Sequence, residues 1–199
     1  SRKELAVSPE STADLAAQAT QQVTVELAEI QAAAQESLDL LASIAAPDMY
    51  KYAFPPLYIT LWTMLREELV KIRNFPQIAL GLPRGFAKTV VIKLLILYII
   101  LFTQKRFILI LCENEQKAKN ILSDVAAMLD EPNIIATFGD WKLGRTQDTQ
   151  TIKRVGFRGR NIVLMGAGAG TGIRGMTLDN RRPDVMVFDD IQSKEGAKS

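Results

Sequence analysis

Apolar residues along the chain form two kinds of segment, short continuous runs and longer stretches with a helical period. Short runs at 77–81, 106–112 and 184–189 predict buried strands. Residues 115–129 place apolar side chains three and four positions apart, which predicts an amphipathic helix. Residues 90–102 are almost entirely apolar and predict a buried helix. This order indicates a three-layer α/β domain with a mostly parallel central sheet and right-handed crossovers.

The first 46 residues have a different composition, rich in Ala, Gln, Glu and Leu, and predict one or two helices. From Thr24 an apolar stripe follows a helical spacing and ends before Pro47. We therefore expect a helical appendage at 1–46, its later part packed against a domain at 47–199. The stripe consists of Leu27, Ile30, Ala34, Leu38, Leu41 and Ile44. A further helix is predicted at 58–73, leading into the first strand.

Composition excludes several kinds of chemistry. The chain has no histidine, which rules out imidazole bases, Ser-His triads and histidine-bound zinc within it. Its one cysteine, Cys112, lies in an apolar run and is interpreted as a packing residue. The longest apolar run, 90–102, has 13 residues (102 minus 90, plus one) and is interrupted by Lys93. A membrane-spanning helix needs about 20 residues, so we expect no membrane association.

Positive charge gathers late in the chain. Residues 142–182 hold nine bases against two acids, although the net charge is only +2. Such a cluster could contact a nucleic-acid backbone, or it could supply an arginine to a neighbouring subunit's nucleotide. Alternatively, it is a solvated hairpin, because Arg158-Gly159-Arg160 predicts a turn between strands at 151–157 and 161–165. The bases are Lys142, Arg145, Lys153, Arg154, Arg158, Arg160, Arg174, Arg181 and Arg182.

A Lys-Thr pair, Lys88-Thr89, stands where the strand at 77–81 gives way to a helix. This context is typical of a phosphate-binding loop, in which the lysine contacts β- and γ-phosphate oxygens and the hydroxyl binds Mg²⁺. The usual motif has glycine six residues and one residue before the lysine, where this chain has Leu82 and Ala87. The alternative is an ordinary Pro-Gly turn that precedes a helix. The predicted loop comprises Pro83, Arg84, Gly85, Phe86, Ala87, Lys88 and Thr89.

Paired carboxylates end the last predicted strand. Asp189 and Asp190 follow the apolar run that begins at Val185, as in a Walker B element. Ligands of open α/β sheets bind at the carboxyl ends of the strands. We therefore expect Asp189, with Thr89, to bind Mg²⁺, and Asp190 to orient the attacking water in phosphoryl transfer from ATP.

Taken in order, these segments resemble the large subunit of viral and phage terminases, the ATPases that package DNA into capsids. The loop from Pro83 to Thr89 is similar to the family's deviant Walker A. Residues 172–175, Gly-Ile-Arg-Gly, resemble its Ile-Arg-Gly element, and 182–184 lead into the apolar strand. The strand ends in Asp189-Asp190-Ile191, and many relatives carry paired acids there. The resemblance covers roughly residues 54–192.

The resemblance implies a RecA-like P-loop ATPase of the additional-strand class that hydrolyses ATP to drive double-stranded DNA into a procapsid. It implies ATP and Mg²⁺ as ligands, and Lys88, Asp190 and Arg84 as catalytic residues, Arg84 acting on the γ-phosphate. Implied partners are DNA, other copies of the chain in a ring, the portal or procapsid and the small terminase subunit, all in the host cytoplasm. Since nine residues follow Asp190 (199 minus 190), we expect a truncated ATPase domain without the family's nuclease domain or nuclease activity.

Two other functions fit the same residues. A RecA-like helicase or translocase shares both Walker elements. A non-hydrolysing, nucleotide-dependent assembly module would fit Ala87 before the lysine and aspartate, not glutamate, at position 190. The alternating glycines of 166–170 follow a strand without opening a clear helix, which disfavours a dinucleotide-binding fold.

Overall fold

The computed structural model describes residues 9–70, 88–170, 177–178 and 180–191. Two helices, α1 (Pro9–Glu36) and α2 (Leu38–Ala45), open the chain, followed by α3 (Pro56–Val70) and α4 (Lys88–Phe102). Next come β1 (Phe107–Cys112), α5 (Glu115–Leu129), α6 (Pro132–Phe138) and a short 3₁₀ helix (Trp141–Gly144). The remaining elements are β2 (Arg145–Asp148), β3 (Ile152–Phe157), β4 (Arg160–Gly168) and β5 (Val185–Asp189).

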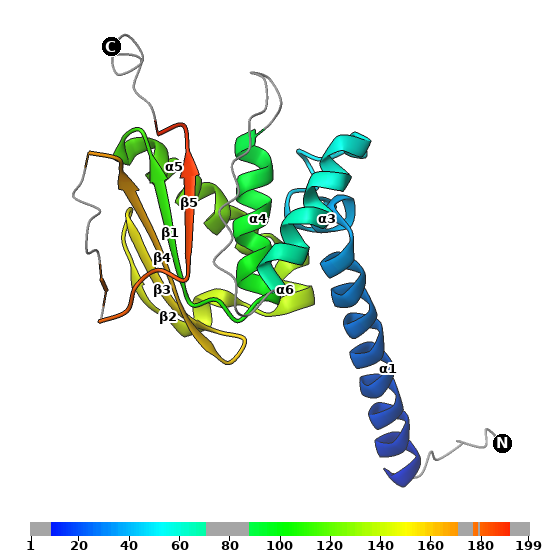
Figure 1. Ribbon diagram of the computed structural model, residues 1–199. Coiled ribbons are helices and arrows are strands. Elements are labelled where there is room, and N and C mark those ends of the chain that lie inside the picture. Colours follow the sequence, from blue (N-terminus) through cyan, green and yellow to red (C-terminus); the bar gives the residue numbers. More distant parts are fainter. Residues whose placement is uncertain (1–8, 71–87, 171–176, 179, 192–199) are drawn as a thin grey trace, which may run out of the picture.

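The five strands form one mixed sheet in the order β2-β3-β4-β1-β5 (Figure 1). Strand β1 pairs in parallel with β4 and β5, whereas β2 with β3 and β3 with β4 are antiparallel. The predicted mostly parallel, RecA-like sheet is therefore wrong. The physical reason is the turn at Arg158-Gly159, where φ is +49° and +73°. Positive φ at both central residues lets β3 turn directly into β4, so no crossover helix separates these strands.

The helices of the described ranges cover one face of the sheet. Buried residues of α2, α4 and α5 share one core with Ile108 and Ile110 of β1. On the opposite face, Phe107, Leu109 and Leu111 form a separate, smaller cluster with Ala167. The predicted third layer is thus not found among the described residues, which form a helical layer on a sheet.

Strand β5 was predicted to be buried on both faces, and this prediction is also wrong. Met186 is 42 % exposed and Phe188 is 52 % exposed, while Val187 packs into the helical core. In the described part of the sheet, β5 pairs with β1 alone, so it lies at the edge. The strand predicted at 77–81 lies outside the described residues.

Several predicted elements are confirmed. Helix α5 has the predicted bounds, and α4 is a buried helix over the predicted apolar run. Strands β3 and β4 form the predicted hairpin, and the described residues before position 46 form two helices. The helical stripe is interrupted at Ser37, whose hydroxyl accepts a hydrogen bond from Leu40 N–H and caps α2. The domain boundary at residue 46 stays a prediction.

Helix α1 projects from the rest of the molecule along most of its length (Figure 1). Its end is anchored where Gln31 Nε2 donates to Thr137 O of α6 at 2.6 Å, and where Arg66 of α3 pairs with Glu36 at 2.6 Å. The next helix, α2, buries Leu38, Leu41, Ala42 and Ala45 in the main core. The appendage thus contributes its second helix to the core.

Candidate functional site

The carboxyl ends of three parallel strands meet at one edge of the sheet. The register aligns Cys112 of β1 with Gly168 of β4 and with Asp189 of β5. Helices α4 and α5 have their first residues, Lys88 and Glu115, at the same edge. Helix N-termini and strand carboxyl ends are both favourable places for an anionic ligand, so this edge is the natural candidate site.

The structure brings the two predicted magnesium ligands together. Thr89 Oγ1, in the first turn of α4, donates a hydrogen bond to Asp189 Oδ2 at 3.1 Å, across 100 residues of sequence. Both side chains are half-buried. Two oxygens on adjacent corners of an octahedral Mg²⁺ shell lie about 2.9 Å apart, given Mg–O distances of about 2.0–2.1 Å. The donor pair therefore fits a magnesium ion that takes its other ligands from phosphate and water.

Asp190 occupies an unusual backbone conformation. Its φ is +45°, in the left-handed region, which aspartate and asparagine tolerate better than most residues. The backbone N–H of Glu113, just after β1, donates to Asp190 O at 3.1 Å and holds this turn against the neighbouring strand. The Asp190 side chain is exposed, so water can reach its carboxylate.

Two charged residues near this edge were missed by the sequence interpretation. Lys117 Nζ lies 2.6 Å from Glu113 Oε2, and this hydrogen bond, with the charges of Asp190 and Asp189, raises the Lys117 pKa. Burial, reinforced by Asp189 and Asp190, raises the pKa of the Cys112 thiol to about 11, which keeps it protonated at neutral pH. Glu113 could have been found by applying the strand-end rule to 106–112 as well as to 184–189.

Apart from Lys88, the remaining predicted site residues fall outside the described ranges. Residues 83–87, including Arg84, and the Gly-Ile-Arg-Gly segment at 172–175 are among them. Lys88 is the first described residue of α4 and is half-buried. Among the described residues, no three Asp, Glu or Cys side chains lie close enough together to bind a metal ion by themselves. A metal at Thr89 and Asp189 would thus depend on ligands from substrate and water.

Gly166 and Gly168 have a packing role. A Cβ on Gly166 would lie 2.9 Å from Leu122 Cδ1, and a Cβ on Gly168 would lie 2.9 Å from the backbone N of Glu115. Strand β4 can therefore approach α5 closely enough to set the helix beside the strand ends.

We expect Gly168→Ala to lower the free energy of unfolding by about 1–3 kcal/mol, because the new methyl group meets backbone that must shift. Urea denaturation measures this loss. Gly170→Ala is the matched control, since its Cβ would meet nothing within 4 Å, and it should change stability by less than about 0.5 kcal/mol. Equal stability of the two variants would contradict the close approach of α5 to β4.

The residues of the predicted basic cluster do not all lie at the surface. Arg160 is buried, and its guanidinium donates to Ile100 O, Thr103 O and Lys105 O at the end of α4. Lys153 is buried and pairs with Asp148, and Asp148 also pairs with Arg145. The pKa of Asp148 is lowered, chiefly by its hydrogen bond with Lys153. The hairpin interpretation is confirmed for the fold of this segment.

Within the described ranges, none of the helices combines the length and apolar character needed to cross a bilayer. Comparison of the chain with protein families, with curated proteins and with solved structures found no match.

Proposed function

We propose that the chain binds and hydrolyses Mg²⁺-ATP, as the ATPase domain of a viral terminase large subunit that drives double-stranded DNA into a procapsid. The observation that carries this proposal is the 3.1 Å contact between Thr89 Oγ1 and Asp189 Oδ2. Thr89 belongs to the predicted phosphate-binding loop and Asp189 to the predicted Walker B element, two motifs that are far apart in the sequence. The contact needs only α4 and the edge strand β5, so it is compatible with a mixed sheet.

Each residue has a distinct role in this proposal. The Lys88 ammonium neutralises charge on the β- and γ-phosphates, and Thr89 and Asp189 hold the metal. Bound Mg²⁺ would supply further charge neutralisation of the phosphate oxygens. The Asp190 carboxylate orients the attacking water and accepts its proton, while Arg84 stabilises the transferred phosphoryl group. In the packaging assembly, the partners would be DNA, further copies in a ring, the portal and the small subunit, in the host cytoplasm.

Calorimetric titration of the chain with Mg²⁺-ATP tests the site directly. We expect saturable binding that Lys88→Ala weakens by about 10- to 100-fold, since a charge-assisted hydrogen bond contributes about 1.5–3 kcal/mol. Lys51→Ala is the matched control, because Lys51 is exposed and belongs to neither the predicted loop nor the strand ends. The control should bind like the parent.

Chelation of Mg²⁺ with EDTA should also weaken binding of the parent chain. Circular dichroism establishes that each variant is folded before titration. A folded parent that does not bind Mg²⁺-ATP, or a Lys88→Ala variant that binds as tightly as the parent, would contradict the proposed site.

A further inference from the structure

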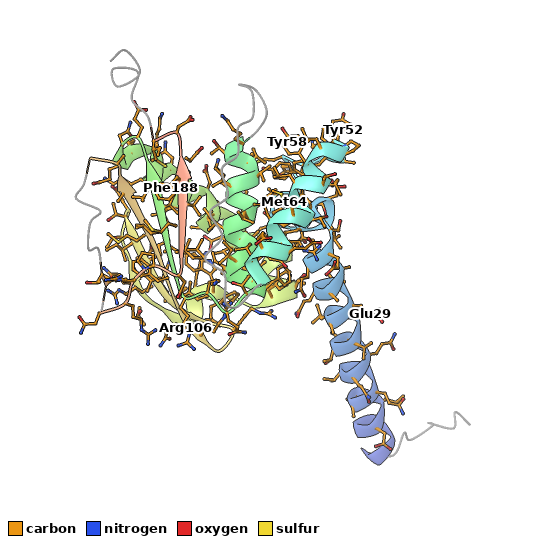
Figure 2. The ribbon with its side chains drawn as sticks, viewed as in Figure 1. Glu29, Tyr52, Tyr58, Met64, Arg106 and Phe188 are labelled. Carbon is orange, nitrogen blue, oxygen red and sulfur yellow. The ribbon has the colours of Figure 1, made fainter. Side chains whose placement is uncertain are left out.

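A second concave site lies on the sheet face that the described helices leave open. It is a cavity of about 380 Å³ at the amino-terminal ends of β1 and β4, opposite to the carboxyl ends where Asp189 lies. Arg106 marks this end of the sheet, and Phe188 lies near the other (Figure 2). The cavity is thus separate from the candidate nucleotide site.

Strand register builds the floor and one wall of the cavity. Phe107 of β1 is aligned with Val163 of β4, and Val163 is aligned with Arg154 of β3. These three side chains therefore lie in one row on the open face. Leu178 adds to the apolar floor of the cavity. Paired backbone hydrogen bonds of 3.0 Å between Leu178 and Arg181 place Arg181 at its rim.

The charge of the cavity is one-sided. Arg106, Arg154 and Arg181 line it, and among its described lining residues none is acidic. Asp184 lies nearby, but its Oδ2 accepts the backbone N–H groups of Arg106 and Phe107 at 2.7 and 2.8 Å. That carboxylate is thus engaged in fixing the start of β1, and the charged side chains among the described lining residues are all basic.

Two exposed arginines, Arg106 and Arg181, beside an apolar floor suit a ligand that has both phosphate and a less polar body. Arginine forks match phosphate oxygens in a bidentate geometry, and Asn161 and Thr146 add neutral donors to the lining. Small-ligand sites occupy about 300–1,000 Å³, so this cavity is large enough for one nucleotide unit. We propose that the cavity binds the phosphodiester backbone of a nucleic acid through Arg106 and Arg181.

This proposal names a contact surface for the DNA partner of the proposed function, and in that respect it rests on it. The test is therefore made without ATP. Fluorescence anisotropy measures binding of a labelled 20-base-pair duplex, and of the corresponding single strand, over a series of salt concentrations. The variants are Arg106→Ala/Arg181→Ala and the control Lys51→Ala/Lys119→Ala. The control removes the same charge from exposed and helix-side positions, since α5 packs on the opposite face.

We expect the arginine double variant to bind nucleic acid at least about tenfold more weakly at low salt, with a salt slope smaller by about 2, one unit for each lost phosphate contact. The control and Lys88→Ala should bind like the parent. The probe that binds more tightly, the duplex or the single strand, shows which form of nucleic acid the cavity prefers. If the arginine variant matches the control, or the parent binds neither probe, the proposal is wrong whatever the result with ATP. Calorimetry also measures binding of inorganic phosphate to the same proteins. If the arginine variant loses phosphate binding but binds nucleic acid like the parent, the proposal is overturned and the cavity is a site for a free anion.

Discussion

Replacing Asp190 with asparagine is expected to slow steady-state ATP hydrolysis by about 10²- to 10⁴-fold, the contribution of a positioned general base. Mg²⁺-ATP affinity should change by less than about threefold, because the proposed metal ligands Thr89 and Asp189 stay in place. A phosphate-release assay gives the rate, and calorimetry gives the affinity. The two readouts together separate loss of chemistry from loss of binding.

Asparagine is the informative substitution because of the backbone at this position. Asp190 has φ of +45°, a conformation that asparagine also tolerates, whereas alanine would add strain. The variant therefore removes the carboxylate charge without disturbing the turn that accepts the hydrogen bond from Glu113 N–H. Asp48→Asn, an exposed aspartate before α3, is the matched control and should hydrolyse ATP at the parental rate.

The outcome also discriminates between the proposed function and its alternatives. An Asp190→Asn variant that hydrolyses ATP as fast as the parent would show that this carboxylate is not the base. If the folded parent binds Mg²⁺-ATP but releases no phosphate at any protein concentration, the ATPase proposal fails, and a nucleotide-dependent assembly module is supported. If dilute monomers hydrolyse as fast as concentrated protein, neighbouring subunits contribute nothing to the rate.

Much of the local structure follows from the sequence because each element carries its own pattern. The apolar spacing of 115–129 sets the buried face of α5, and the continuous run 107–112 fits a strand with buried residues on both faces. The Thr89–Asp189 contact could be predicted as well, since each residue follows from a motif whose ends are fixed by flanking elements. These signals depend on the local sequence, so the elements they predict are correct even though the predicted sheet topology is wrong.

Apart from the β3–β4 hairpin, strand pairing could not be predicted from these signals. An apolar run does not encode whether its neighbour is parallel, and β4 meets β1 in parallel but β3 in antiparallel orientation. The exposure of Met186 and Phe188 follows from the position of β5 at the edge of the described sheet, which is a property of strand order. Strand order and orientation therefore depend on tertiary packing, which the apolar runs do not determine.

Arg160 shows the same limit for charged residues. By sequence it belongs to a basic cluster, yet it is 8 % exposed, and burial, followed by the charges of Arg158 and Arg106, lowers the pKa of its guanidinium. The last carbonyls of a helix have no partner within the helix, and a cation there also interacts favourably with the helix dipole. Its contact with Ile100 O satisfies such a group, and its contacts with Thr103 O and Lys105 O hold the segment that follows α4. Helix α4 is therefore attached to the sheet at both ends, through Thr89 and through Arg160.

From this arrangement we expect Arg160→Met to lower the free energy of unfolding by about 3 kcal/mol or more, because three carbonyl oxygens lose a charged donor. For a chain of this length, that loss corresponds to a fall in Tm of roughly 6–12 °C. Arg160→Lys should recover part of the loss, since one ammonium cannot donate to three carbonyls as a planar fork does. Thermal denaturation followed by circular dichroism measures all three proteins.

The matched control is Arg158→Met, two residues earlier on the same turn. Arg158 is exposed, its Nη2 lies 3.4 Å from Gln31 Oε1, and its guanidinium stacks 5.4 Å from the centre of the Phe138 ring. Exposed contacts of this kind contribute about 1 kcal/mol or less, so this variant should unfold within a few degrees of the parent. If Arg160→Met were as stable as Arg158→Met but bound nucleic acid more weakly, Arg160 would belong to a nucleic-acid-binding surface after all. A loss of stability confined to Arg160 instead establishes it as the cap that fixes α4, and with it Thr89, against the sheet.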